Sequence, residues 1–205
     1  AGEACDALTQ GDVNVVGGTC WLWCREDMRD AVDVLFVDEA GQMSLANVIA
    51  AAPAASSVVL LGDPQQLDQP LQGVHPPGAD RSALAHLLGG HQTMPAELGL
   101  FLDGTWRLHP EVCAYTSEVF YEGRLHPRPG CERQEVIGQG QLAGSGIRFI
   151  SVDHHGNDTA SEAEASEINR LVAELMTASP TWIDIKGEEH PLAVNGVLVV
   201  TPYNS

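Results

Sequence analysis

Two short apolar runs that end in acidic turns are the clearest feature of the hydrophobic pattern. The run Val34–Val37 is followed at once by Asp38–Glu39, and the run Val58–Leu61 is followed by Gly62–Asp63. A continuous apolar run of this length is typical of a strand that is buried on both faces of a parallel sheet. The pattern therefore predicts two neighbouring parallel strands and an α/β fold around them.

Local start and stop signals predict four helices. Each has a capping serine or a proline at its first helical position, and three of them end at a glycine or a proline. The predicted helices are Ser44–Ala52, Ser82–Leu88 with the apolar stripe Leu84, Leu87 and Leu88, Pro110–Tyr121, and a helix that begins at the capping box of Ser161 and Glu164 and runs through Met176.

Four further apolar segments favour strands, and the remaining segments favour loops. The predicted strands are Val13–Val16, Leu98–Leu102, Ile147–Val152 and Val197–Val200, the last of them buried. The segment Trp182–Pro191 is predicted to be a polar hairpin or loop, and Gln69–Asp80 and Gly123–Gly146 are predicted to be mainly loop.

Polar side chains follow the two central strands where ligands of α/β folds bind, at the carboxyl edge of the sheet. Parallel pairing would place along one rim the residues Asp38, Glu39, Asp63, Gln65 and Gln66. One acid that holds Mg²⁺, a second that takes a proton from water, and an amide that touches a terminal phosphate would together suit nucleotide hydrolysis. An acidic pair that only caps a strand in solvent is the alternative for Asp38 and Glu39 taken alone.

Four motifs, in this order, resemble those of superfamily 1 helicases, in the branch of the nonsense-mediated-decay RNA helicase and the replication nuclease-helicases. DEAG at Asp38–Gly41 resembles motif II, and Gly62–Leu67 resembles motif III, of form G-D-x-x-Q-L. TWRLHP at Thr105–Pro110 resembles Q-Y-R-M-H-P, and VVTPYNS at Val199–Ser205 resembles V-I-T-P-Y. Thr105 stands where that family has glutamine, so no contact of that side chain is carried over.

The resemblance implies an α/β fold made of parts of two RecA-like (P-loop NTPase) lobes with parallel sheets flanked by helices. Residues 1–104 would form the C-terminal part of the first lobe, and residues 105–205 the N-terminal part of the second, with a hinge at Asp103–Gly104. A P-loop of form G-x-x-x-x-G-K-[ST] is absent, and the only lysine is Lys186. We therefore expect an internal fragment of a larger helicase, itself inactive, with bacterial fusions of a RecB-like nuclease to a helicase as a model for the whole.

The same resemblance implies roles for individual residues, with ATP and Mg²⁺ as cofactors. Asp38 would hold Mg²⁺ through water and Glu39 would activate the attacking water. Gln66 and Arg107 would sense the γ-phosphate, and Asp63 would order motif III. The further candidates are Gly62 and Gln65 at the nucleotide, and Thr19, Thr201, Pro202 and Tyr203 at the nucleic acid.

Several of these assignments have a structural alternative. Thr19 would equally suit a strand end whose hydroxyl lies in water, and Arg107 would suit an ion pair that only supports the fold. His109 is interpreted as an orienting or packing residue. Trp21 and Trp23 suit either base stacking or core packing.

The formal net charge of −18 opposes nucleic-acid binding, because phosphate binding depends on Lys and Arg. Within Arg107–Arg148, however, five arginines balance five glutamates. Helicases of this type hold a strand largely through backbone amides, hydroxyls and stacking. The expected partner is therefore single-stranded nucleic acid, with DNA favoured over RNA.

Composition restricts the setting of the protein. No apolar run is long enough for a membrane span, and the N-terminal residues lack a signal-peptide pattern, so a cytoplasmic protein without a membrane partner is expected. Five cysteines at irregular spacing favour free thiols, and Cys20-x-x-x-Cys24 is at most half of a metal site.

Together these features favour a fragment of an ATP-dependent DNA or RNA helicase or translocase, with 5′→3′ movement suggested only by the branch. A non-hydrolysing interaction scaffold with a P-loop-type fold is the main alternative. A different P-loop enzyme is a third hypothesis, and it would leave the G-D-x-x-Q-L motif unexplained.

Overall fold

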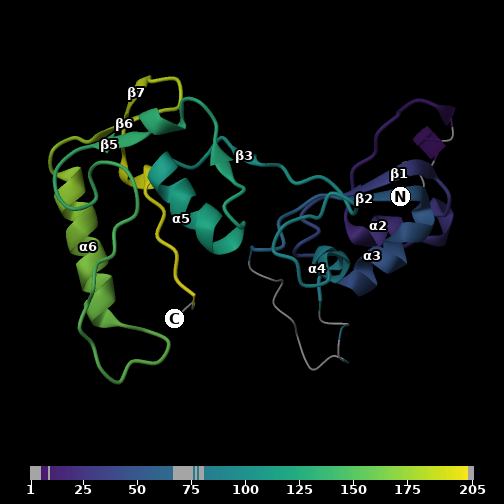
Figure 1. The fold of residues 1–205 in the computed structure, drawn as a ribbon, viewed down its shortest axis with the longest axis horizontal. Coiled ribbons are helices and arrows are strands. Elements are labelled where there is room, and N and C mark those ends of the chain that lie inside the picture. Colours follow the sequence, from purple (N-terminus) through teal and green to yellow (C-terminus); the bar gives the residue numbers. More distant parts are fainter. Residues whose placement is uncertain (1–5, 9, 67–75, 77, 79–80, 203–205) are drawn as a thin grey trace. The chain divides into compact units, whose positions relative to one another are not determined.

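The computed structural model describes residues 6–8, 10–66, 76, 78 and 81–202. The chain divides into two compact units, Ala1–Phe101 and Leu102–Ser205, and each is described by itself (Figure 1). Both units contain helices and short strands, so the structure is of the mixed α/β kind that was predicted.

The first unit contains a two-stranded parallel sheet and the helices around it (Figure 1). Its elements are α2 (Cys20–Trp23), the 3₁₀ helix η1 (Glu26–Met28), β1 (Val32–Val37), α3 (Leu45–Ala51), the 3₁₀ helix η2 (Ala52–Ala54), β2 (Ala55–Leu60) and α4 (Ala83–Leu88).

The predicted parallel pairing of the two central strands is confirmed. Val34 of β1 lies opposite Ser57 of β2, and Val37 lies opposite Leu60. The chain between them forms α3, which begins at Ser44, whose hydroxyl accepts a hydrogen bond from the Asn47 backbone N–H. This β–α–β arrangement brings the carboxyl ends of both strands to one edge.

Burial of the two strands differs from the prediction, because only one face of the sheet is covered. Leu35 and Val37 are 4% and 6% exposed, whereas Val34 and Phe36 on the other face are 40% and 64% exposed. In β2, Val58 and Val59 point to opposite faces and are 36% and 37% exposed, so this strand is only partly covered even on the face that packs against the helices. The prediction of burial on both faces is therefore wrong for the described residues, since the helices of this unit pack on one face.

The core of the first unit lies between the covered face of the sheet and its helices. It consists of Trp23, Met28, Leu35, Val37, Ala40, Val48, Ala51, Ala54, Ala83, Leu84 and Leu88. In α4, Ser82 caps the N-terminus and Gly89 ends the helix in the left-handed conformation at φ 59°, as predicted. Leu87 is 52% exposed, so its place in the predicted apolar stripe is wrong.

The second unit has two small sheets and two longer helices (Figure 1). Its elements are β3 (Gly104–Thr105), α5 (Pro110–Phe120), β4 (His126–Pro127), the 3₁₀ helix η3 (Cys131–Arg133), β5 (Glu135–Ile137), α6 (Glu162–Met176), β6 (Thr181–Ile183), β7 (Glu189–Pro191) and the 3₁₀ helix η4 (Val194–Gly196).

The second unit is built partly from parallel and partly from antiparallel pairs. β3 pairs with β4 in parallel, whereas β5, β6 and β7 form an antiparallel sheet in that order. Cys113, Cys131, Leu171 and Leu175 are its buried apolar residues. The predicted helices α5 and α6 and the predicted hairpin within Trp182–Pro191 are found, and the Ser161 hydroxyl accepts from the Glu164 backbone N–H.

Four of the predicted strands are not strands. Residues 13–16, 98–102, 147–152 and 197–200 contain no helix or strand. Val15, Leu100, Phe149 and Leu198 within them are 85% to 93% exposed. A strand needs hydrogen bonds from a neighbour, and these runs pair with no strand among the described residues.

Asp103 and Gly104, where a hinge was expected, both lie within the second unit and are held there by contacts with Arg128. Gly104 belongs to β3, and the Arg128 guanidinium lies against it and pairs with Asp103 at 3.2 Å. The boundary between the compact units falls just before, between Phe101 and Leu102.

Among the residues that the structure describes, every helix is too short or too polar to cross a lipid bilayer.

Candidate functional site

The loop that follows β1 carries the two acids of the DEAG motif. Both Asp38 and Glu39 are exposed, and the Glu39 backbone N–H donates to the Asp38 carboxylate at 3.0 Å. The Gln42 backbone N–H donates to the Glu39 carbonyl at 2.8 Å, which closes a tight turn. The turn leaves both carboxylates in solvent at the carboxyl end of the strand.

Glu39 has a left-handed backbone, with φ at 53°. A non-glycine residue in this region costs about 1–3 kcal/mol when the surrounding structure imposes it, and such residues cluster at functional sites. The carboxylate of Glu39 has no hydrogen bond or ion pair with any other described residue. The left-handed backbone is held by the turn itself, through the bonds of the Glu39 N–H and carbonyl, and it leaves the carboxylate exposed.

The loop that follows β2 lies directly against the DEAG loop. The Leu61 backbone N–H donates to the Val37 carbonyl at 2.9 Å, and the Ala40 backbone N–H donates to the Leu61 carbonyl at 2.8 Å. These bonds extend the parallel ladder beyond the strands, so the two motif loops form one continuous edge.

Asp63 organises this second loop from within. Its carboxylate accepts from the Gln65 backbone N–H at 3.0 Å and from the Gln66 side-chain amide at 3.3 Å. The Gln65 side chain donates to the Gln92 carbonyl at 3.0 Å and so ties the loop to a neighbouring segment. Of the two glutamines in this loop, Gln66 is the exposed one and Gln65 is half-buried.

Two glycines allow the loops to approach this closely. A Cβ on Gly41 would overlap the carbonyl oxygen of Asp63 and lie 2.9 Å from its carbon. A Cβ on Gly62 would lie 2.8 Å from the Ala40 nitrogen. These neighbours are backbone atoms, which cannot rotate away, so the contact between the loops requires glycine at both positions.

Gly41→Ala is expected to lower the free energy of unfolding by about 1–3 kcal/mol, because the added methyl group forces the two loops apart. Urea unfolding followed by circular dichroism would measure the change. Gly17→Ala is the matched control, since a Cβ on Gly17 meets nothing within 4 Å. Equal stability of the two variants would contradict the contact.

The acids of this edge are compatible with a Mg²⁺ ion that is held mainly through water. Among the described residues, Asp38, Glu39 and Asp63 do not gather into a three-ligand group. Mg²⁺ usually keeps several waters and takes one or two carboxylates together with substrate phosphates. A single exposed carboxylate such as Asp38, acting through water, is compatible with that chemistry.

Arg107 lies in the second unit, between β3 and α5. Its backbone N–H donates to the Thr105 hydroxyl at 3.2 Å, and its exposed guanidinium pairs with no other described residue. His109 caps α5 by accepting from the Glu111 backbone N–H at 3.3 Å, so it has a positioning role in the local fold. The turn thus presents Arg107 free of any structural ion pair among the described residues.

The candidate nucleic-acid residues are spread over both units. Thr19 is exposed and precedes α2 without a side-chain cap bond. Trp21 is 81% exposed, whereas Trp23 is 8% exposed in the core, so the two tryptophans do not form one face. Thr201 and Pro202 are exposed, and Tyr203 lies outside the described residues.

Cys20 and Cys24 lie together at the two ends of α2. Their sulfur atoms are 3.5 Å apart, and the Cys20 thiol also donates to the Asn47 carbonyl at 3.4 Å. Burial raises the pKa of the Cys20 thiol to about 11, and Cys24 acts in the same direction through its hydrogen bond and charge. Both are free thiols, and in the described chain no third metal-ligating group joins them.

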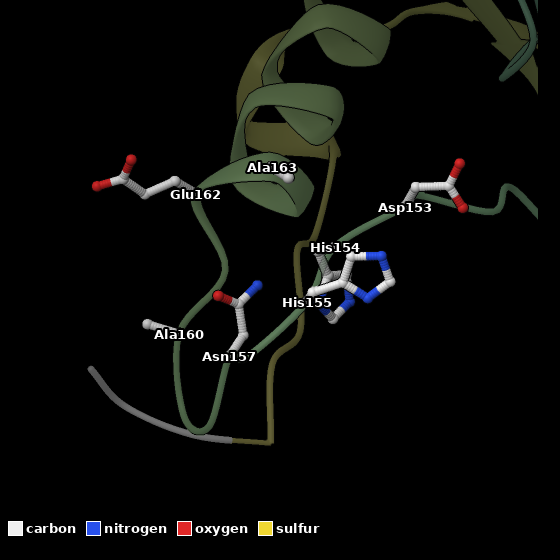
Figure 2. Close-up of a pocket in the computed structure, with 7 residues that line it drawn as sticks. All are labelled: Asp153, His154, His155, Asn157, Ala160, Glu162 and Ala163. Atoms are coloured by element: carbon white, nitrogen blue, oxygen red, sulfur yellow. The ribbon is translucent and has the colours of Figure 1, made fainter.

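An open pocket of about 590 Å³ lies beside the N-terminus of α6, and none of the predicted site residues lines it. It is lined by Asp153, His154, His155, Asn157, Ala160, Glu162 and Ala163. Figure 2 shows the two histidines on the segment that precedes α6, with the Glu162 carboxylate pointing away from them. His154 pairs instead with Glu164 at 3.2 Å. The two adjacent histidines are the signal in the sequence for this group, which was not among the predictions.

Comparison with known proteins supports the resemblance drawn from the motifs. Residues 7–70, which contain both loops of the edge, match the family model of an AAA domain. The chain is 34% identical over 122 residues, or 55% of its length, to the mouse 5'-3' DNA helicase ZGRF1. It is 26% identical over 182 residues to the mouse 3'-5' exoribonuclease HELZ2 and 27% over 192 residues to the human protein of that name, with 83% of the chain covered in each case.

The matched region is a small part of each relative. The chain spans about 6% of the length of the curated relatives it matches. The similarity therefore supports a superfamily 1 helicase fragment and leaves the branch, including the resemblance to RecB-like fusions, as a prediction.

Proposed function

We propose that this chain forms parts of two RecA-like lobes of an ATP-dependent helicase or translocase that moves along single-stranded nucleic acid. The observation that carries the proposal is the backbone contact between the loops after β1 and β2. Each loop carries one superfamily 1 motif, and the contact puts both motifs on one edge of a parallel sheet.

The roles proposed for the side chains are those that the motif resemblance implies, and the exposure of Asp38, Glu39, Gln66 and Arg107 is compatible with them. Asp38 holds Mg²⁺ through water, and Glu39 activates the water that attacks the γ-phosphate of ATP. Gln66 senses the γ-phosphate from the loop that the Asp63 carboxylate orders. Gly62 and Gln65 lie beside the nucleotide in this proposal. For Arg107 the motif resemblance implies that its guanidinium supplies a positive fork to the γ-phosphate.

The nucleic-acid contacts are proposed for Thr19, Thr201, Pro202 and Tyr203. DNA is favoured as the partner because the relative of highest identity named above is a DNA helicase. The same name supports 5′→3′ movement. A fused nuclease domain and a cytoplasmic setting are also part of the proposal.

Phosphate release by the intact protein that contains this chain tests the proposal. With ATP and Mg²⁺, single-stranded DNA is expected to stimulate release, because helicases of this class couple hydrolysis to strand movement. Binding of nucleic acid without any phosphate release would favour the non-hydrolysing scaffold instead.

The isolated 205 residues are the matched comparison. They are expected to release no phosphate, because the lysine and hydroxyl of a P-loop are absent from their sequence. The isolated chain could instead hydrolyse ATP when DNA is added and lose this activity in Glu39→Gln. That result would contradict the expectation that hydrolysis requires a P-loop.

A further inference from the structure

The hairpin formed by β6 and β7 holds an aspartate in a fixed position. Trp182 lies opposite His190 and Ile183 lies opposite Glu189, so the connecting loop begins at Asp184. One oxygen of the Asp184 carboxylate accepts from the Lys186 backbone N–H at 2.8 Å and from the Glu188 backbone N–H at 2.9 Å. The other oxygen faces the imidazole of His190 at 3.3 Å.

The ring of His190 is held as well. It packs against the Trp182 ring, with centroids 4.8 Å apart and an interplanar angle of 31°. Its side chain is 37% exposed and that of Asp184 is 18% exposed, so both are part-covered but open to solvent. The imidazole is therefore supported on one side and reachable on the other.

A second carboxylate completes the group. Ligand atoms of Asp184, Glu188 and His190 all lie within 4.8 Å of one another. Across residues 6–8, 10–66, 76, 78 and 81–202, no other three histidine, cysteine or acidic side chains come together in this way. The antiparallel register of the hairpin creates the group, because it folds residues 184 and 190 onto each other.

We propose that Asp184, Glu188 and His190 form a binding site for a divalent transition-metal ion of the Zn²⁺ type. Zn²⁺ binds imidazole nitrogen and carboxylate oxygen at ~2.0–2.2 Å, so two ligands of one ion lie roughly 3–3.5 Å apart. The 3.3 Å between the Asp184 oxygen and His190 Nε2 matches that separation. Glu188 is exposed, and its carboxylate lies within 4.8 Å of the other two ligand atoms, which makes it the third ligand of the proposed site.

The ligand set decides which class of ion is bound. Imidazole suits Zn²⁺, Ni²⁺ and Cu²⁺, whereas Mg²⁺ and Ca²⁺ prefer sites made of oxygen alone. His190 would bind through Nε2 and carry its proton on Nδ1, and water would fill the remaining positions. The metal would then replace the hydrogen bond between His190 and Asp184 and cross-link the two strands.

Titration calorimetry of the chain with Zn²⁺ tests the site. We expect His190→Gln and Glu188→Gln each to weaken the affinity of one binding event by at least ~10-fold, as loss of one ligand or of its support commonly does. His154→Gln is the matched control, because His154 also pairs with a carboxylate, Glu164 at 3.2 Å, but belongs to no three-ligand group. Any Zn²⁺ binding at the thiols of Cys20 and Cys24 is the same in all these variants, so it does not affect the comparison of their affinities.

Tryptophan fluorescence provides a second readout. Cu²⁺ bound at His190 is expected to quench Trp182, and Trp182→Phe is expected to abolish that part of the quenching while Zn²⁺ binding persists. A purely structural role of His190 would lower the melting temperature of His190→Gln and leave its Zn²⁺ isotherm unchanged.

Two results would overturn the site: the absence of Zn²⁺ binding by the wild-type chain, or equal Zn²⁺ affinity in the wild-type, His190→Gln and Glu188→Gln chains. ATP hydrolysis is not measured in these experiments, so their outcome is independent of the proposed helicase function.

Discussion

Glu39→Gln in the intact protein is expected to lower kcat for ATP hydrolysis by about 10²- to 10⁴-fold, the usual contribution of a general base. Glutamine has the shape of glutamate but cannot take a proton from the attacking water. Affinity for ATP should change little, because the P-loop and Mg²⁺ carry most of the ground-state binding. Phosphate release at saturating ATP and single-stranded DNA, paired with equilibrium binding of a labelled ATP analogue, separates the two effects.

The substitution Glu39→Gln is chosen so that the left-handed backbone at residue 39 stays the same. Glutamine and glutamate differ little in backbone preference, so φ of 53° should be retained and the melting temperature unchanged. Glu97→Gln, at another exposed glutamate of the same unit, is the matched control and should keep wild-type kcat. A Glu39→Gln enzyme within a few-fold of wild type would remove Glu39 from the role of base.

Local signals in the sequence were sufficient to predict α3, α4, α5 and α6, whereas the short helix α2 was not predicted. Ser44, Ser82 and Ser161 each cap a helix through a hydrogen bond from a backbone N–H three residues later. Such a cap depends on residues adjacent in sequence, and its pattern is therefore visible without knowledge of the fold.

Strands were predicted correctly only where the sequence also contained a second apolar run that could pair with the first. The runs that became β1 and β2 lie about one crossover helix apart, and they pair in parallel as expected. Apolar runs such as Leu98–Leu102 and Val197–Val200 have the same local composition but no neighbouring strand among the described residues. An apolar run specifies a preference for burial, whereas strand formation also depends on distant backbone groups.

The candidate site was only partly predictable for the same reason. The placement of acids at strand ends follows from the pattern of apolar and polar residues. The overlap of a Gly41 side chain with Asp63 depends on how two loops distant in sequence approach each other. Motif spacing gave no indication of the Gln65 bond to the Gln92 carbonyl.

The group at Asp184, Glu188 and His190 shows what a hairpin prediction leaves out. A hairpin within Trp182–Pro191 was expected, but its register was not. Only the pairing of Trp182 with His190 brings the imidazole to Asp184. Since a shift of one residue would turn His190 to the other face of the sheet, the site follows from register rather than from composition.

Arg107→Ala is expected to lower kcat of the intact protein by at least ~10²-fold, given that arginine fingers contribute ~10³–10⁵ in related phosphoryl-transfer reactions. The guanidinium is exposed and pairs with no other described residue, so its removal breaks no ion pair among them. Its contribution should be largest when charge develops on the transferred phosphoryl group, and nucleotide affinity should therefore fall far less than kcat.

Arg128 offers a contrast within the same unit, because its guanidinium pairs with Asp103 at 3.2 Å and covers Gly104. Arg128→Ala should lower the melting temperature, whereas Arg107→Ala should leave it unchanged because the Arg107 side chain pairs with no other described residue. Comparison of the two variants separates a structural arginine from one that acts on the nucleotide.

Arg107→Lys is expected to restore kcat only in part, because a point charge on a flexible stem does not reproduce the planar fork of the guanidinium. Steady-state phosphate release and equilibrium binding of a labelled ATP analogue, on variants with wild-type melting temperature, provide the measurement. If Arg107→Ala keeps near-normal kcat, the arginine does not contact the γ-phosphate and belongs to the surface of the second unit. If lysine restores kcat fully, charge alone is sufficient and the bidentate geometry is excluded.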